Sequence, residues 1–380
     1  MRIHEYQAKQ ILEDFGVPVP PGKVATDPDE AAEIFAGLPG DAAVVKPQSY
    51  GFIPEGGRGE SLARSAEEAA ALARKMIGKR FGRGQLCRRP VTKVLLEQYV
   101  EAESSLYLAV VMDPGLVAPV MLASGAALQH EPGAMPTESV SREVIDPRFG
   151  TLSFQWRKVT AALGLDRSMV PQVTAVASGL YRAFIECECI EAEIGELGLT
   201  AGRELVALEA RMRFDTNALF RHHEIEALRD PAEFGETENT LREKWMRYVA
   251  LAGRVGCVMT ATGSALVMLD CLADAGARPG GILYLAGEES AEKAAYGLTC
   301  LLREESFRAV IVEVPRDPEF AGRVVSGVRL ALGDQATGKR VVVLAASDAA
   351  RVAAAGLGDV TDVLRVARSA SEAAVAVGKN

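Results

Sequence analysis

Hydrophobic positions change their spacing near residue 240, and the change divides the chain into two regions. Before residue 240, helix-like and strand-like segments follow one another in irregular order. After residue 250, near-continuous apolar runs alternate with alanine-rich stretches of helical spacing. This pattern and the chain length predict two domains, 1–240 and 241–380, with a polar stretch around the boundary.

The first region mixes helices with strands that pair as hairpins. A serine at residue 65, followed by glutamate three residues later, is a good helix start. Asp113, Pro114 and Gly115 form a turn between two apolar strands. The pattern predicts helices at 5–15, 65–76 and 167–186, and strands at 42–46, 94–99, 106–112, 117–122, 190–199 and 204–214. Antiparallel hairpins mixed with helices in this way indicate an α+β domain.

The second region predicts a doubly wound α/β domain. Its expected strands are 256–260, 281–285, 309–314, 340–345 and 363–367. Strands that are apolar on both faces are typical of parallel sheets covered by helices on either side. We therefore expect a five-stranded, flavodoxin-like sheet. Ligands in such sheets bind at the carboxyl ends of the strands, so the turns after Thr260, Leu285 and Val314 are where chemistry is expected.

Composition and charge restrict the class of protein. A formal net charge of −9 disfavours electrostatic binding to nucleic acid or to an anionic membrane. The longest apolar run, 255–273, is interrupted by polar residues, so no membrane span is expected. The N-terminal segment has the pattern of a charged amphipathic helix rather than of a signal peptide. We therefore expect a cytoplasmic protein.

Two motifs resemble a known family. Residues 3–12 read IHEYQAKQIL, and residues 217–221 read NALFR. Both are similar to the β subunit of the nucleoside-diphosphate-forming acyl-CoA synthetases, such as succinyl-CoA synthetase. The resemblance spans almost the whole chain and implies an N-terminal ATP-grasp domain, with a small subdomain at about 20–97, followed by a flavodoxin-like CoA-ligase domain.

The resemblance also implies partners and cofactors. In this family the ATP-grasp domain uses ATP or GTP with Mg²⁺ to phosphorylate a histidine on a separate α-type subunit. That subunit binds CoA, and the phosphohistidine activates a carboxylate. None of the four histidines of this chain fits as the phosphate acceptor, so the acceptor is expected on the partner.

Lys46 and Glu97 are the predicted nucleotide-binding side chains. Lys46 ends an apolar strand where the family places the lysine that neutralises nucleotide phosphates. A fixed ammonium group there would stabilise charge on a transferring phosphoryl group. Glu97 matches an acidic residue near the adenine and ribose. From the residues alone, the alternatives are a surface lysine and a solvated carboxylate at strand ends, and the resemblance favours the binding roles.

Gly57, Arg58 and Gly59 belong to a glycine-rich loop that resembles a phosphate cradle. Glycine lets backbone N–H groups approach an anion, and Arg58 adds positive charge. The family carries Gly-Gly-Arg-Gly closer to its lysine, whereas here the segment 51–55 (GFIPE) intervenes. Its proline and glutamate both oppose phosphate binding. Either the loop has shifted in register or the cradle is lost, and both interpretations stay open.

The expected metal site departs from the family pattern. The family holds magnesium with an asparagine and an aspartate, and the matching positions here are Gly195 and Glu209. Gly195 has no ligand atom, although Mg²⁺ requires oxygen donors in near-octahedral order. Glu209 and Glu196 are the candidate replacements, and the alternative is a pair of solvent-facing carboxylates. Glu193 matches the family glutamate that faces the phosphohistidine, and it is the predicted catalytic residue.

Thr260, Thr262 and Gly263 are the predicted substrate-binding residues. They lie in the turn 260–263 (TATG), where the family has Asn-Gly-Ala-Gly. Hydroxyl groups, together with the exposed N–H groups of a helix N-terminus, can bind an anion. The two later turns carry carboxylates and prolines where the family has glycines that approach the phosphohistidine and the carboxylate.

Two functional hypotheses follow from these observations. In the first, the chain is the β-type subunit of an ATP-dependent carboxylate–CoA ligase and passes phosphate to a histidine of an α-type subunit. In the second, it is a catalytically degenerate β-like subunit that serves as a structural or regulatory partner of an α-type acyl-CoA-binding protein.

Overall fold

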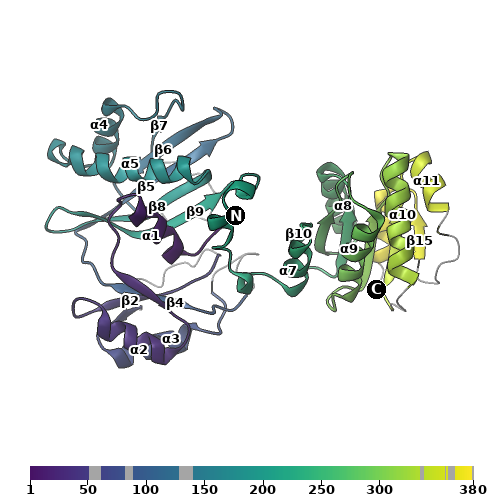
Figure 1. Ribbon diagram of the computed structural model, residues 1–380, viewed down its shortest axis with the longest axis horizontal. Helices are drawn as coiled ribbons and strands as arrows, with labels where there is room; N and C mark the ends of the chain where they lie inside the picture. Colours follow the sequence, from purple (N-terminus) through teal and green to yellow (C-terminus); the bar gives the residue numbers. More distant parts are fainter. Residues whose placement is uncertain are drawn as a thin grey trace. The chain divides into compact units, whose positions relative to one another are not determined.

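The computed structural model describes residues 1–50, 61–81, 89–127, 140–333, 338–355, 357 and 364–378 of the 380-residue chain. Contacts between residues divide it into two compact units, Met1–Glu233 and Phe234–Asn380 (Figure 1). Each unit has its own hydrophobic core. The boundary expected after residue 240 falls inside helix α7 (Glu236–Glu243).

The N-terminal unit contains a small antiparallel sheet with the strand order β1-β4-β2-β3. These strands are β1 (Gly22–Ala25), β2 (Ala43–Pro47), β3 (Leu62–Ala63) and β4 (Val94–Gln98). Helices α2 (Pro28–Gly37) and α3 (Ala66–Met76) lie together on one side of this sheet (Figure 1). Their small alanine side chains allow close packing on the buried valines and leucines of β2 and β4. Ser65 Oγ accepts a hydrogen bond from Glu68 N and caps α3, as its sequence predicts.

A larger antiparallel sheet completes the N-terminal unit, with the order β7-β6-β5-β8-β9. Its strands are β5 (Ser104–Asp113), β6 (Ala118–Ser124), β7 (Ser141–Val144), β8 (Cys189–Leu199) and β9 (Leu205–Phe214). One face packs against helices α1 (Glu5–Asp14), α4 (Ser153–Ala162) and α5 (Val170–Glu186). Short helical turns lie at η2 (Arg167–Met169), η3 (Leu219–Arg221), α6 (His223–Glu226) and η4 (Pro231–Glu233).

Alternation along β8 and β9 separates apolar side chains from charged ones. Ala192 and Ile194 of β8 and Ala210 and Met212 of β9 point into the helix-covered core. Because successive side chains of a strand point to opposite faces, the glutamates and arginines between them lie on the other face. Tyr107 of β5 is buried on that second face. The sheet therefore presents a charged set of side chains opposite its helical layer.

The C-terminal unit is a doubly wound domain with the strand order β10-β12-β11-β13-β14-β15. Its strands are β10 (Arg247–Ala250), β11 (Val255–Met259), β12 (Pro279–Tyr284), β13 (Ala309–Glu313), β14 (Arg340–Leu344) and β15 (Leu364–Ala367). Helices α9 (Ala291–Arg303), α10 (Pro318–Gly333) and α11 (Asp348–Ala355) pack on one face, and α8 (Thr262–Asp274) and α12 (Ala370–Gly378) on the other. The five parallel strands have the flavodoxin-like order.

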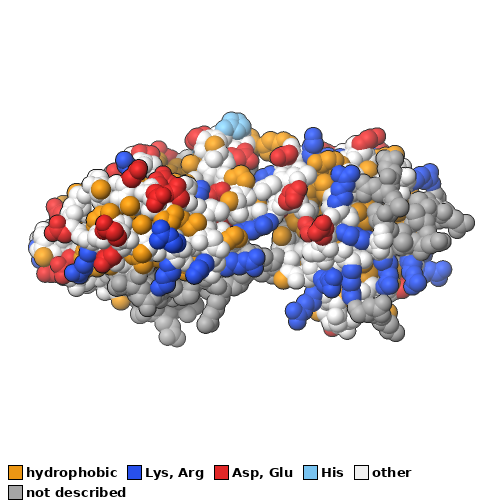
Figure 2. Space-filling view, turned by 90° about the horizontal axis from the view of Figure 1, so that it is seen from below, with side chains coloured by type: hydrophobic (Ala, Val, Ile, Leu, Met, Phe, Trp, Pro, Cys, Tyr) orange, Lys and Arg blue, Asp and Glu red, His pale blue; other side chains and the backbone are white. Residues whose placement is uncertain are grey.

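The structure confirms the predicted fold classes and corrects the strand count of the C-terminal sheet. This sheet has a sixth strand, β10, which pairs antiparallel with β12 at the edge. Its side chains are half buried or exposed, so it lacks the apolar run that marks the parallel strands. No helix among the described residues is long and apolar enough to cross a membrane. On the face drawn in Figure 2, the N-terminal unit carries acidic and basic side chains interspersed with hydrophobic ones.

Candidate functional site

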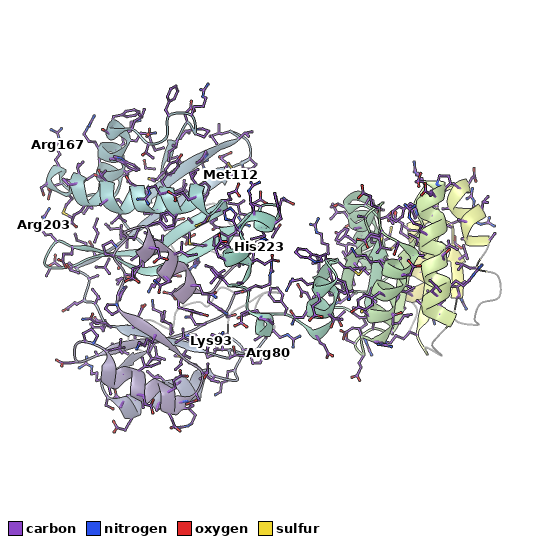
Figure 3. All side chains as sticks on the ribbon, viewed as in Figure 1. Arg80, Lys93, Met112, Arg167, Arg203 and His223 are labelled. Atoms are coloured by element: carbon purple, nitrogen blue, oxygen red, sulfur yellow. The ribbon has the colours of Figure 1, made fainter. Side chains whose placement is uncertain are left out.

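Helix α1 carries two charged side chains of the site, and its N-terminus is held by His4. The His4 N–H donates to Gln7 Oε1 at 2.9 Å, and His4 Nε2 lies 3.1 Å from Asp230 Oδ2. Lys93, labelled in Figure 3, directly precedes β4 and pairs with the same Asp230 oxygen at 2.6 Å. Burial lowers the pKa of His4 to about 4. A neutral imidazole therefore anchors α1 at neutral pH and fixes the position of its charged face.

The predicted phosphate-binding lysine lies in a cluster of four charges. Lys46 Nζ is 2.6 Å from Glu97 Oε1 and 2.9 Å from Glu5 Oε1, and it donates to the carbonyl oxygen of Leu208 at 2.5 Å. Burial opposes protonation of Lys46, but the attraction of Glu5 and then Glu97 outweighs it and raises the pKa above its ordinary range. Because Lys46 belongs to β2 and Leu208 to β9, this side chain joins the small sheet to the large one.

Lys9 of α1 is the fourth member of the cluster, and sequence reasoning missed it. Its side chain is almost fully buried. Lys9 Nζ lies 2.5 Å from Glu97 Oε2 and 3.0 Å from Glu5 Oε1, and it also donates to Leu208 O at 2.8 Å. Each oxygen of Glu97 therefore contacts its own lysine. The available signal was the Glu5–Lys9 spacing of four residues, which places both side chains on one face of a helix.

This arrangement determines how an anion can approach Lys46. The two lysines and two glutamates are formally neutral as a set, so the cluster has no excess positive charge. A phosphate group that contacts Lys46 must compete with Glu5 and Glu97 for the ammonium group, or bind beside them. The site can hold an anion only if its added contacts outweigh repulsion from the two carboxylates.

Glu193, the predicted catalytic residue, lies on the charged face of the large sheet. It is 1% exposed and is paired in register with Arg211 of β9. An Arg211 nitrogen lies 3.4 Å from Glu193 Oε1, and the same guanidinium contacts Glu209. Burial raises the pKa of Glu193 to about 8, against the opposing effect of Arg211. Arg211 bridges the two carboxylates, a role that the sequence did not indicate.

The residues around Gly195 do not fit a magnesium ion. A Cβ added at Gly195 would lie 3.0 Å from Glu209 Oε2 and 3.3 Å from Glu193 Oε1, so the longer glutamate occupies the space beside the glycine. Glu209 is bound to Arg211, and Glu196 Oε1 accepts a hydrogen bond from Ser105 Oγ at 2.5 Å. In the described ranges, no group of three or more His, Cys, Asp or Glu side chains is arranged to hold a metal.

The remaining predicted residues are the three of the glycine-rich loop and the three of the turn 260–263. Gly57, Arg58 and Gly59 lie outside the described residues. Thr260 follows β11, and Thr262 and Gly263 begin α8, so the predicted helix N-terminus is present. The Thr260 donors are engaged by the carboxylate of Glu313, the residue that ends β13.

Comparisons of the sequence with known proteins agree on one family. A family model described as the ATP-grasp domain matches residues 2–199. The chain is 34% identical over 337 residues to the succinate–CoA ligase [ADP-forming] subunit beta of Wolinella succinogenes, covering 86% of this chain and 85% of that protein. It is 35% identical over 318 residues to the same subunit of Anaeromyxobacter dehalogenans, covering 83% of this chain and 82% of that protein.

Comparison of the structures agrees on the fold. The ATP citrate lyase from Methanothrix soehngenii, solved with citrate and coenzyme A, superimposes with a TM-score of 0.70 at 16% sequence identity. The match covers 96% of this chain and 95% of that chain. At this sequence identity, the structural similarity is evidence for the fold only. From the sequence matches, the chain belongs to the family of succinate–CoA ligase β subunits, with an ATP-grasp domain in its N-terminal half.

Proposed function

We propose that this chain is the nucleotide-binding β-type subunit of an ATP-dependent carboxylate–CoA ligase. Its N-terminal unit binds ATP or GTP and passes a phosphoryl group to a histidine of an α-type subunit, which binds CoA. Family membership supports the general role. The main observation in favour of a nucleotide site is the position of Lys46, whose ammonium group lies where the two sheets of the N-terminal unit meet.

The proposed chemistry is electrostatic. Lys46 neutralises the phosphates and stabilises charge on the transferring phosphoryl group. Glu97 orients Lys46 through its 2.6 Å contact, so the ammonium group is fixed before nucleotide arrives. Glu193 is the carboxyl proposed to meet the phosphohistidine of the partner, which requires its contact with Arg211 to open because it is 1% exposed. No step is assigned to magnesium, because Glu193 and Glu209 are engaged by Arg211 and Glu196 by Ser105.

The contacts of His4 and His222, two of the three described histidines, support an acceptor on another chain; the third, His223, is exposed. His4 is buried against Asp230. His222 Nε2 lies 2.8 Å from Glu188 Oε2, and its Nδ1 lies 3.2 Å from Glu224 Oε1. Nε2 of His4 and both ring nitrogens of His222 are therefore engaged by carboxylates and are not open to an incoming phosphoryl group.

A second candidate function is a degenerate β-like subunit that acts as a structural or regulatory partner of an α-type protein. The specific observation that favours it is Arg211, whose guanidinium holds Glu193 and Glu209 together beside a glycine. Arg211 neutralises Glu209 without an exchangeable metal ion, and the pKa of Glu193, raised by burial to about 8, keeps that neighbour largely protonated at neutral pH. Such a site is suited to stability rather than to turnover.

Nucleotide binding by the purified chain tests the first proposal. The thermal unfolding midpoint is measured with ATP or GTP at millimolar concentration, with and without Mg²⁺. A nucleotide at roughly a hundred times its Kd stabilises the folded state by about 3 kcal/mol. Lys46→Met should abolish this increment. Lys158→Met is the control, because Lys158 of α4 pairs with Glu143 away from the cluster, and it should retain the increment.

Transfer to a partner separates the two candidates. A co-expressed α-type protein is incubated with the chain and γ-labelled ATP, and acid-labile label on histidine is measured. Histidine labelling of the partner that is lost in the Lys46→Met variant supports the ligase function. A partner that co-purifies tightly but stays unlabelled, together with no nucleotide-dependent stabilisation, refutes the ligase and favours the structural role.

A further inference from the structure

The turn between β11 and α8 collects hydrogen-bond donors at one end of the C-terminal sheet. Thr260 follows β11, and Ser264 lies in the first turn of α8. Strand β13 is a parallel neighbour of β11, with Val312 opposite Val258. Glu313, the last residue of β13, therefore lies beside Thr260 although the two are far apart in sequence.

One carboxylate oxygen of Glu313 accepts three hydrogen bonds from this turn. Glu313 Oε2 lies 2.7 Å from Thr260 N, 2.8 Å from Thr260 Oγ1 and 2.8 Å from Ser264 Oγ. A carboxylate has about four acceptor positions shared by its two oxygens. Each oxygen has about two of these positions, so three donors fully occupy Glu313 Oε2, and Ser264 Oγ, which has a single hydrogen, also lies 3.0 Å from Ala261 O.

Glu313 also supplies what α8 lacks in its own sequence. The residue before the helix is Ala261, which has no side chain able to cap it, and the first turn contains no acidic residue. Helix N-termini are stabilised by negative charge because their first N–H groups have no partner within the helix. The carboxylate that provides this charge comes from the neighbouring strand.

We propose that Glu313 is a built-in anion that occupies the donors of the β11–α8 turn, Thr260 N, Thr260 Oγ1 and Ser264 Oγ, and excludes free carboxylates and phosphates from them. A free anion would have to displace a group that is tethered to a rigid strand and has little entropy left to lose. It would also be repelled by the displaced carboxylate. In this protein, an acid substrate or a phosphoryl group is therefore recognised elsewhere, and the hydroxyl groups of Thr260 and Ser264 serve the internal carboxylate. This inference does not depend on nucleotide binding.

The test uses orthophosphate and succinate as probes and the full-length chain labelled with ¹⁵N-threonine. The Thr260 amide signal reports on this turn alone, so binding in the N-terminal unit does not interfere. In wild type the signal should not shift in a saturable way. In Glu313→Ala it should shift and saturate, with binding tighter than in wild type by about tenfold or more, as expected when a charged competitor is removed. Adding Ser264→Ala to that variant should weaken the binding again.

Glu319→Ala is the matched control, because Glu319 is an exposed glutamate of α10 that pairs only locally with Arg323. It should behave as wild type. If Glu313→Ala does not fold, Glu313→Asp withdraws the carboxylate by one methylene and should give a smaller gain. Saturable binding at Thr260 in wild type would overturn the proposal, as would the absence of any gain in a folded Glu313 variant.

Discussion

Replacing Glu5 by glutamine tests whether the charge cluster around Lys46 is held together electrostatically. Glu5 Oε1 lies 2.9 Å from Lys46 Nζ and 3.0 Å from Lys9 Nζ. Glutamine has nearly the same shape and keeps one acceptor oxygen, but it carries no charge. The variant leaves two lysines with Glu97 as their single carboxylate, so the cluster gains an uncompensated positive charge.

The expected magnitude follows from the pKa of Glu5. Burial opposes its ionisation, but attraction by Lys46 and then Lys9 outweighs burial and lowers the pKa from 4.5 to about 2. At about 1.4 kcal/mol per pKa unit, the folded state favours the ionised form by about 3 kcal/mol. This agrees with the cost of about 3–5 kcal/mol for removing one partner of a buried ion pair. We therefore expect Glu5→Gln to lower the free energy of unfolding by about 3 kcal/mol at neutral pH.

Tryptophan fluorescence during urea unfolding provides a suitable assay. Trp156 is 6% exposed and lies in the core of the N-terminal unit, whereas Trp245 in the other unit is already 76% exposed. The fluorescence change therefore follows the N-terminal unit. Because the folded pKa is below the unfolded one, the stabilisation by Glu5 is complete above about pH 4.5 and is lost as the pH falls towards 2. The difference between wild type and variant should shrink over this window.

Glu13→Gln is the control, because Glu13 is an exposed glutamate on the same helix whose carboxylate accepts a hydrogen bond from the Gln10 side chain. It should change the free energy of unfolding by less than about 0.5 kcal/mol at any pH. A loss below about 1 kcal/mol in Glu5→Gln would refute the electrostatic reasoning. A larger loss that stays constant as the pH is lowered would assign the effect to packing instead.

Three further predictions concern close contacts. Arg211→Met should destabilise the N-terminal unit by about 3–5 kcal/mol. In thermal unfolding, this variant should also be stabilised by Mn²⁺, whereas wild type should not be. A variant that does not respond to Mn²⁺ would contradict the view that the guanidinium stands between the two carboxyl groups. Gly195→Ala should cost less than about 1 kcal/mol in urea unfolding, because its Cβ would meet only the flexible end of Glu209 at 3.0 Å. Glu209→Asp should remove this cost in a double-mutant cycle, and additive losses would reject the coupling. Gly179→Ala should lower the free energy of unfolding by about 1–3 kcal/mol, because its Cβ would lie 2.8 Å from a main-chain oxygen. Gly37→Ala, whose Cβ would meet no neighbouring atom within 4 Å, should be neutral or stabilising. Equal effects in the two variants would refute the steric reasoning.

Much of the fold was predictable because it depends on local pattern. The apolar runs of β11, β13 and β14 indicate strands buried on both faces, and alanine-rich helical spacing indicates the helices that cover them. Strand β10 was not predicted, because an edge strand with polar side chains has no continuous apolar run. Its place in the sheet depends on pairing with β12, which is a tertiary contact.

The residues of the site also differ in whether the sequence could identify them. Lys46 and Glu97 could be named only through the family resemblance, because a charge at the end of an apolar strand is by itself equally typical of a surface residue. Lys9 and Glu313 could not, because a lysine on a helix and a glutamate ending a strand have the pattern of ordinary surface residues. Lys9 meets Glu97 across 88 positions of sequence, and Glu313 meets Thr260 across 53. Only the packing of the sheets and helices brings these groups together. It also buries Lys9 and Glu97, and burial makes a partner obligatory for them, since an isolated charge inside a protein is too costly to keep.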